Sequence, residues 1–156
     1  MARVVLITGG MSGIGLATAT VFYRAGDTIF IVDKQESAEG MTVVRASGGK
    51  FYAADVRDCE AVHAMLQSAH TDLGGLDIVV ANAGVPTRFQ PLHEVEPSYW
   101  QRVLEIDLFG VFHTLHAALP LLRAQQKGVI LTISSVGADL CGANGGPYVA
   151  AKAAVN

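Results

Sequence analysis

The sequence predicts an α/β fold in which a doubly wound parallel sheet of five strands lies between helices. Three observations predict it: short runs rich in Val, Ile and Phe recur, they are apolar at successive positions instead of alternating, and helix-like segments separate them. Strands that are apolar on both faces are typical of a parallel sheet covered on both sides, and right-handed crossovers then give the doubly wound arrangement. The 156 residues fit one domain, residues 1–156, without a linker.

The expected elements alternate along the chain. Strands are expected over residues 4–7, 28–32, 50–53, 76–81 and 128–133. Helices are expected over residues 14–25, 36–46, 59–73 and 97–126, of which the second is short and the last is long. Pro97 suits the first turn of the long helix, where its missing N–H costs nothing. A further helix is expected to begin at Tyr148.

The composition excludes several classes of protein. Hydrophobic residues make up 51% of the chain and charged residues 16%, against a usual charged share of about 25%. This excludes a disordered chain, and it requires either a large core or an apolar surface for a partner. The net charge is −3 and no basic block is present, so a nucleic-acid partner is not expected.

The sequence carries no sign of export or membrane insertion. Cys59 and Cys141 lie far apart and outside any CxxC pattern, so neither a disulfide framework nor a zinc site is indicated, and the reduced cytoplasm is the expected location. The N-terminus runs into the first expected strand without the features of a signal peptide. The longest apolar stretch, residues 108–122, is broken by two histidines and Pro120, so no membrane partner is expected.

A glycine-rich turn, TGGMSGIG over residues 8–15, follows the first expected strand and opens the first helix. Glycines at 9, 13 and 15 allow a tight turn and a close approach of the backbone to a ligand. The helix N-terminus would offer N–H groups and partial positive charge to a pyrophosphate. An ordinary strand-to-helix turn is the alternative interpretation.

Asp33 lies at the end of the second expected strand, eighteen residues after Gly15. A carboxylate there can accept hydrogen bonds from both hydroxyls of an adenosine ribose, and it would repel a 2′-phosphate. The sequence therefore favours NAD over NADP, with Lys34 as the one opposing charge. A solvated acid at a strand end is the alternative.

The spacing of this turn resembles the TGxxxGxG turn of the short-chain dehydrogenase/reductase family, of the classical type. The resemblance implies a Rossmann-type fold and extends to Asp55-Val56, which matches an adenine contact, and to Asn82-Ala-Gly84, although Ala81 stands where members often have a second Asn. The residues that it implies for cofactor binding are Gly9, Met11, Ser12, Gly13, Ile14, Gly15, Asp33, Asp55, Val56, Asn82, Ala83, Gly84, Tyr148 and Lys152.

The candidate chemistry lies near the C-terminus, where Ser135 closes the fifth expected strand and Tyr148 and Lys152 follow four residues apart. On a helix, these two side chains share one face. A free phenol ionises near pH 10, and an ammonium at about 4 Å stabilises a phenolate by about 4 kcal/mol in an effective dielectric of about 20. The resemblance implies that Tyr148 is the general acid/base, that Lys152 assists it and binds the nicotinamide ribose, and that Ser135 orients the substrate oxygen.

Asp107 departs from the family pattern, because members usually carry Asn at this position in the long helix, where its backbone helps to hold a relay water. The carboxylate either keeps the backbone geometry beside Lys152 or over-stabilises the ammonium and slows proton transfer. A purely structural role is the third possibility. We include Asp107 with the catalytic candidates.

Three further features receive modest interpretations. His113 and His116 have metal-ligand spacing but no third ligand in view, so they are expected to be ordinary helix-face residues. The apolar face of the long helix, which the resemblance implies is a subunit interface of a homo-oligomer, carries Trp100, Phe109, Phe112 and Leu115. Cys141 is expected near the substrate cleft.

The resemblance implies an NAD-dependent oxidoreductase that interconverts a secondary alcohol and a ketone. Family members continue beyond the Tyr-Lys helix into two further strands and a substrate-binding segment, so the chain is expected to be the cofactor-binding part of such an enzyme, with the fifth strand as an exposed edge. The expected substrate is a small-molecule alcohol or ketone. A non-catalytic dinucleotide-binding module is the alternative function, and a purely structural α/β unit is a third.

Overall fold

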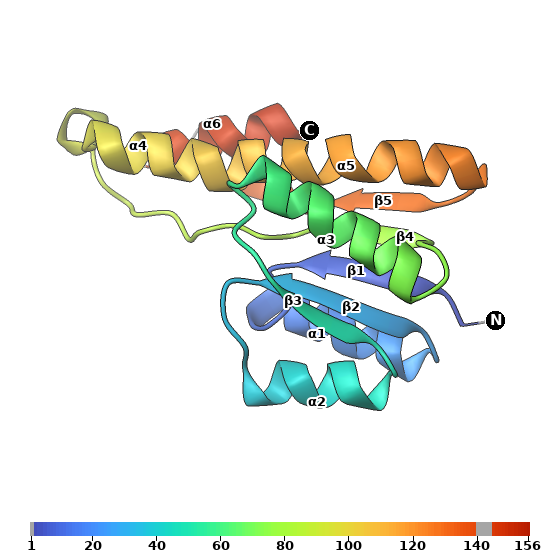
Figure 1. The fold of residues 1–156 in the computed structure, drawn as a ribbon. Helices are drawn as coiled ribbons and strands as arrows, with labels where there is room; N and C mark the ends of the chain where they lie inside the picture. Colours follow the sequence, from blue (N-terminus) through green and yellow to red (C-terminus); the bar gives the residue numbers. More distant parts are fainter. Residues whose placement is uncertain (1, 140–144) are drawn as a thin grey trace.

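The computed structural model describes residues 2–139 and 145–156 and has the predicted α/β architecture (Figure 1). The sheet is parallel throughout, in the order β3-β2-β1-β4-β5. Its strands are β1 (Val4–Thr8), β2 (Thr28–Asp33), β3 (Lys50–Ala53), β4 (Ile78–Ala81) and β5 (Val129–Thr132). The helices are α1 (Gly13–Arg24), α2 (Ala38–Ala46), α3 (Cys59–Asp72), α4 (Pro97–Leu104), α5 (Gly110–Gln125) and α6 (Gly146–Val155). The change of direction between β1 and β4 makes the sheet doubly wound.

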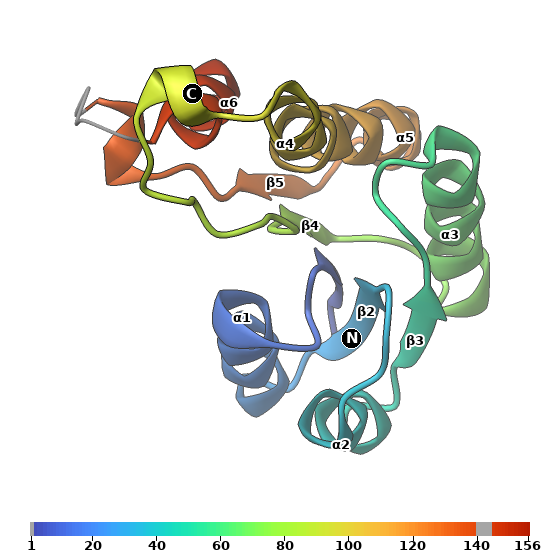
Figure 2. The same cartoon turned by 90° about the vertical axis from the view of Figure 1, so that its left-hand side faces the viewer.

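The helices form two layers, one on each side of the sheet (Figure 2). Helices α1 and α2 cover one face, where Ile7, Ile29 and Val80 belong to a buried cluster. Helices α3 and α5 cover the other face over Leu6 and Val79. Capping side chains set where helices begin. For example, the Asp58 carboxylate caps α3 by accepting a hydrogen bond from the Ala61 N–H at 3.0 Å.

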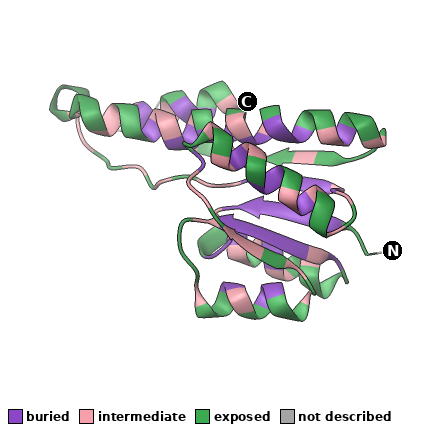
Figure 3. Ribbon diagram, viewed as in Figure 1, coloured by how far each residue is buried: buried purple, intermediate pink, exposed green. Residues whose placement is uncertain are grey.

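The inner strands β1, β2 and β4 are buried almost throughout (Figure 3). Strand β5 is the edge of the described sheet, as expected, but the expectation that helices cover both of its faces is wrong. Val129 and Leu131 are 51% and 42% exposed, whereas Ile130 packs against the core under α5. No described helix covers the other face of β5, so these apolar side chains lie open.

The long helix expected over residues 97–126 is present but divided. A π turn, η2 (Glu105–Phe109), separates α4 from α5 and contains Asp107. Such turns insert an extra residue and frequently occur at functional sites. Pro120 lies within α5 without ending it. The helix that carries Tyr148 begins two residues earlier than expected, because Pro147 occupies its first turn. In the described part of the chain, no helix combines the length and apolar character needed to cross a membrane.

Candidate active site

A cleft of about 710 Å³ lies along the carboxyl ends of the parallel strands, where α/β proteins bind ligands. It joins the glycine turn after β1 with the acids after β2 and β3, the segment after β4, and the face of α6. Predicted site residues that line it are Gly9, Ser12, Gly13, Ile14, Asp33, Asp55, Val56, Asn82, Ala83, Gly84, Asp107, Tyr148 and Lys152. Met11, Gly15 and Ser135 do not line it, and Cys141 lies outside the described residues.

At Gly9 and Gly15, the glycine turn is packed too closely for a side chain. Gly9 has φ +66°, and a Cβ there would lie 2.9 Å from the Cα of Ala83. A Cβ on Gly15 would overlap the carbonyl oxygen of Gly9 and lie 2.6 Å from Nδ2 of Asn82. Gly15 therefore serves the cleft indirectly, because its small size lets α1 begin directly against the turn.

Asn82 and Thr8 tie the glycine turn to the segment after β4. The Asn82 side-chain amide donates to the carbonyl oxygens of Thr8 and Gly9 at 2.9 and 3.1 Å. The Thr8 hydroxyl accepts from the backbone N–H groups of Asn82 and Ala83 at 3.0 and 3.1 Å. We did not predict Thr8 as a site residue, since its partners lie more than 70 residues away and only its place at the head of the turn signals a role.

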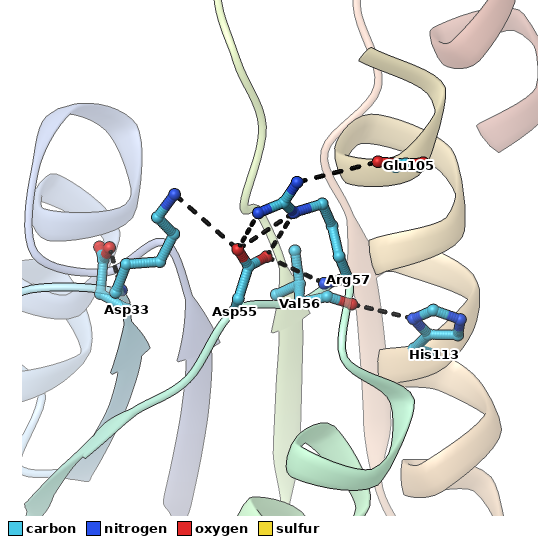
Figure 4. Close-up of polar contacts among 7 residues, drawn as sticks. Asp33, Asp55, Val56, Arg57, Glu105 and His113 are labelled. Atoms are coloured by element: carbon cyan, nitrogen blue, oxygen red, sulfur yellow. Dashed lines mark hydrogen bonds and ion pairs between the residues drawn. The ribbon is translucent and has the colours of Figure 1, made fainter. Parts of the chain in front are cut away.

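The Asp33 carboxylate is fixed at the end of β2. Its Oδ2 accepts from the Met11 N–H at 3.0 Å. Its Oδ1 accepts from the Lys34 N–H at 2.7 Å (Figure 4). Met11 itself is buried against α2, so it positions Asp33 through its backbone. Each carboxylate oxygen retains a further lone pair, which leaves Asp33 able to accept hydrogen bonds from a ligand in the cleft.

The Asp55 carboxylate forms an ion pair with Arg57 (Figure 4). Nε and Nη2 of Arg57 lie 3.0 and 2.7 Å from its Oδ2, and Nζ of Lys34 lies 3.8 Å from the same oxygen. The hydrogen bonds from Arg57 lower the pKa of Asp55. The ammonium of Lys34, the one charge that opposed the choice of NAD, thus points towards Asp55. Arg57 also lies 3.8 Å from Glu105, and its role was not predicted from the sequence.

The loop after β3 is fastened to α5. The carbonyl oxygen of Val56 accepts a hydrogen bond from Nδ1 of His113 at 2.9 Å (Figure 4). His116 instead meets His63 of α3, with 3.3 Å between the ring nitrogens. His113 and His116 therefore have separate partners, and no metal-binding group of three His, Cys, Asp or Glu side chains occurs within residues 2–139 and 145–156.

Tyr148 and Lys152 share one face of α6, as their spacing predicts. Nζ of Lys152 lies 5.8 Å from the centre of the Tyr148 ring and donates to the Ile133 carbonyl oxygen at 2.9 Å. The Lys152 side chain is only 5% exposed. A buried ammonium needs compensating partners, and the end of β5 supplies one of them.

Asp107 places its carboxyl group beside this ammonium. Its Oδ2 lies 3.7 Å from Nζ of Lys152, and its Oδ1 accepts from the Val85 N–H at 2.9 Å. Burial raises the pKa of Asp107, and the hydrogen bond from Val85 and the charge of Lys152 oppose this rise only in part. The structure thus places the carboxyl group of Asp107 near Lys152.

The two serines after β5 have different surroundings. The Ser134 hydroxyl donates to the Lys152 carbonyl oxygen at 3.0 Å and lines the cleft, a contact that the sequence did not reveal. The Ser135 oxygen accepts from the Gly137 N–H at 3.1 Å, which leaves its hydrogen free to donate. A Cβ built on Gly137 would lie 3.3 Å from Oγ of Ser135 and 4.0 Å from Cε1 of Tyr148, so both side chains border the same space.

Comparison with known proteins identifies the family. The family model described as short chain dehydrogenase matches residues 3–156. The chain belongs to this family. Its members include a cis-4-hydroxycyclohexanecarboxylate dehydrogenase from Sinomonas cyclohexanicum, 38% identical over 156 residues, which cover 98% of this chain and 63% of the relative. An L-fucose dehydrogenase from Oryctolagus cuniculus is 35% identical over 153 residues, or 98% of this chain and 54% of the relative.

Solved structures of short-chain dehydrogenases have the same fold as this chain. An NAD+-bound xylitol dehydrogenase superposes with a TM-score of 0.93 at 31% identity, over 98% of this chain and 60% of the other. A carveol dehydrogenase from Mycobacterium avium in complex with NAD gives a TM-score of 0.87 at 34% identity, over 98% of this chain and 61% of the other. The chain thus spans less than two thirds of the length of these relatives.

Proposed function

We propose that the chain forms the cofactor-binding and catalytic part of an NAD(H)-dependent oxidoreductase that interconverts a secondary alcohol and a ketone. One observation carries the proposal: a single cleft is lined both by the glycine turn with Asp33 and by Tyr148 with Lys152. A dinucleotide whose adenosine ribose lay at Asp33 could extend along this cleft to Tyr148. Its nicotinamide would then lie beside the phenol of Tyr148 and the ammonium of Lys152.

The residues at the adenosine end suit NAD. Gly9 and Gly13 have positive φ angles and leave the turn without side chains that would keep a pyrophosphate away. Asp33 presents lone pairs to a ribose, and its charge opposes a 2′-phosphate. NAD-bound relatives with 31% and 34% identity support the same choice. When bound, NAD would supply the hydride acceptor.

The proposed proton chemistry belongs to three side chains. The Tyr148 oxygen takes the proton of the alcohol as the phenolate during oxidation, and it donates that proton as the phenol during reduction. The Lys152 ammonium stabilises the phenolate form. The Ser135 hydroxyl donates a hydrogen bond to the substrate oxygen and stabilises its developing negative charge. Relatives named for hydroxycyclohexanecarboxylate and fucose support a small alcohol as substrate.

The test combines binding with turnover. NAD is titrated by calorimetry, and NADH absorbance is then followed with a panel of secondary alcohols. The proposal expects saturable binding and NADH formation with at least one alcohol. Binding without turnover here, together with turnover by a longer chain that includes the remaining family segments, would favour the alternative of a non-catalytic dinucleotide-binding module.

We also propose a homo-oligomer that forms through the long helix, in the cytoplasm. Phe109 and Phe112 are 49% and 55% exposed on neighbouring turns of η2 and α5, and Leu119 on the same helix is 45% exposed. Large apolar side chains gathered on one helix favour a protein partner. Sedimentation at several concentrations tests this, and a monomer at all of them would contradict it.

Replacing Asp33 by alanine should weaken NAD binding more than NADP binding. We expect at least a tenfold rise in the Kd for NAD, equivalent to about 1.4 kcal/mol, because hydrogen bonds to the ribose are lost. NADP should lose less, since the repulsion of its 2′-phosphate also disappears. Asp72→Ala is the matched control: it removes the same charge from an exposed pair with Lys50, outside the cleft. Equal losses for both cofactors would show that Asp33 does not recognise the ribose.

A further inference from the structure

The Asp107 carboxyl group is the least satisfied polar group of the cleft. Its side chain is 0% exposed, and its Oδ1 is bonded to the Val85 N–H. Its Oδ2 is the one buried side-chain oxygen or nitrogen of the described residues without a hydrogen-bond partner. Leaving a buried carboxylate oxygen unpaired is costly, so this position favours a form of the group that carries less charge.

The nearest cation does not form a hydrogen bond with it. Nζ of Lys152 lies 3.7 Å from Oδ2, beyond hydrogen-bond distance, and is bonded instead to the Ile133 carbonyl oxygen at 2.9 Å. An ammonium has three N–H donors, so two remain for Asp107, for Tyr148 or for a ligand. A Cβ on Gly84 would lie 3.0 Å from Oδ2 and 3.6 Å from Nζ, which shows how closely the backbone confines the pair.

The other ionisable groups around the pair are engaged elsewhere or lie farther along the cleft. From α6 there are Tyr148 and Lys152, and from α4 there is Arg102 on the cleft wall. From the neighbouring turns, Glu105 faces Arg57 at 3.8 Å, and His113 is bonded to the Val56 carbonyl. Among the described residues, Lys152 alone exerts a charge effect on Asp107, and this effect is smaller than the effect of burial, which raises the pKa.

We propose that Asp107 is a proton-controlled positioning residue for Lys152: the neutral acid leaves the ammonium to Tyr148 and the cleft, whereas the ionised form draws the ammonium towards Oδ2. The step is a simple ionisation, in which the O–H bond of the acid breaks and the proton passes to water in the cleft. This inference rests on the proposed function only in the role that it gives to Lys152.

The chemistry of the two forms explains the switch. A neutral carboxyl group has almost the shape of the asparagine amide that is usual in the family, with an O–H donor in place of an N–H donor. The ionised form has no donor and competes with the Tyr148 phenolate for the same N–H groups. Ionisation of Asp107 should therefore reduce the stabilisation that Lys152 gives to Tyr148, and the Asp107→Asn variant should stay in the state that the neutral acid provides.

Infrared spectroscopy of the ligand-free protein tests the protonation directly. A buried carboxylic acid has a C=O band that is lost on ionisation, and wild type should show such a band at pH values where exposed carboxyl groups are already ionised. Asp107→Asn should lack it, and the control Asp72→Asn should keep it. Absence of any band that depends on Asp107 while the protein is folded would overturn the proposal.

The pH dependence of stability provides a second test. An acid whose pKa is raised by folding makes the native state bind more protons than the unfolded chain. Wild type should therefore lose stability as the pH rises from about 3.8, the ordinary value for Asp, through the raised pKa. The Tm of Asp107→Asn should exceed that of wild type by a few degrees at neutral pH, and this difference should shrink as the pH falls towards 4. A lower Tm for Asp107→Asn at every pH would show that the ion pair stabilises the fold and would overturn the proposal.

The functional consequence appears in the pH profile. Wild type should show one ionisation in kcat that Asp107→Asn lacks, while KM for the alcohol stays unchanged. A chain that fails to bind NAD would contradict the proposed function, but the infrared and stability results would still decide the state of Asp107. A chain that binds NAD and shows the same pH profile in both variants would contradict this inference alone.

Discussion

Tyr148→Phe is expected to reduce turnover by about 10²- to 10⁴-fold, the usual contribution of a general acid or base, while the Kd for NAD changes little. The variant loses only a phenolic oxygen, and the ring that lies 5.8 Å from Nζ of Lys152 is kept. Steady-state NADH formation measures the first quantity, and calorimetry measures the second.

Tyr23→Phe is the matched control for this prediction. It removes the same atom from a half-exposed tyrosine on α1 that does not line the cleft. Both its turnover and its NAD affinity should equal those of wild type. Activity retained in Tyr148→Phe would remove Tyr148 from its proposed role, whereas a parallel loss of NAD binding would indicate that the phenol holds the cofactor.

Gly15→Ala is expected to lose most NAD binding and to destabilise the fold by about 1–3 kcal/mol, the usual cost of overpacking a close contact. The added methyl group would overlap the Gly9 carbonyl oxygen and approach Nδ2 of Asn82 at 2.6 Å. It would therefore force apart the glycine turn and the segment after β4. Urea unfolding measures the free energy change, and NAD titration reports the state of the turn.

Gly48→Ala separates this effect from a general intolerance of alanine. Gly48 has φ +68° and nothing within 4 Å of an added Cβ, so the substitution costs only backbone strain, about 1–2 kcal/mol. It should leave the Kd for NAD unchanged, because the residue lies outside the cleft. If Gly15→Ala bound NAD as well as Gly48→Ala does, the close packing of the turn would not matter for the ligand.

The sheet could be predicted because its strands have no polar alternation. The runs at residues 4–7 and 28–32 are apolar on both faces, and both proved to be buried under helices on each side. Element ends were displaced by one or two residues, as for the start of α6, because local capping sets them. The sequence of β5 does not show that one of its faces is exposed, because the burial of a strand face depends on whether a helix from elsewhere in the chain packs on it.

The composition of the cleft could be predicted in large part from the glycine turn, Asp33 and the Tyr-Lys spacing. Most of the turn and Asp33 line the cleft because they lie at the carboxyl ends of parallel strands, and the Tyr-Lys pair lines it from α6. The contacts of Thr8, Arg57 and Ser134 were missed. Thr8 and Ser134 bond to residues that are distant in the sequence, and Arg57 pairs with Asp55 although other acids are near. Neither kind of contact leaves a pattern in the neighbouring sequence.

The complete burial of Asp107 could not be predicted from the sequence. Its sequence context, Ile106-Asp-Leu-Phe-Gly110, indicates an ordinary turn of a long helix and gives no sign of the π turn. The turn packs against α6, which lies about 40 residues farther along the chain. The sequence therefore predicted the position of the carboxyl group beside Lys152 as one alternative, but it contained no sign of the unpaired oxygen.

The single tryptophan, Trp100, allows a direct measurement of whether the cleft binds a nicotinamide dinucleotide. Trp100 lies on α4 against the start of α6, where a Cβ on Gly146 would be 3.0 Å from its ring. Titration with NADH should give saturable energy transfer from Trp100 to the cofactor. Added NAD should displace the NADH and abolish the transfer. Asp33→Ala should weaken NADH binding more than Asp72→Ala does. Folded protein that shows no saturable transfer at millimolar NADH would contradict the account.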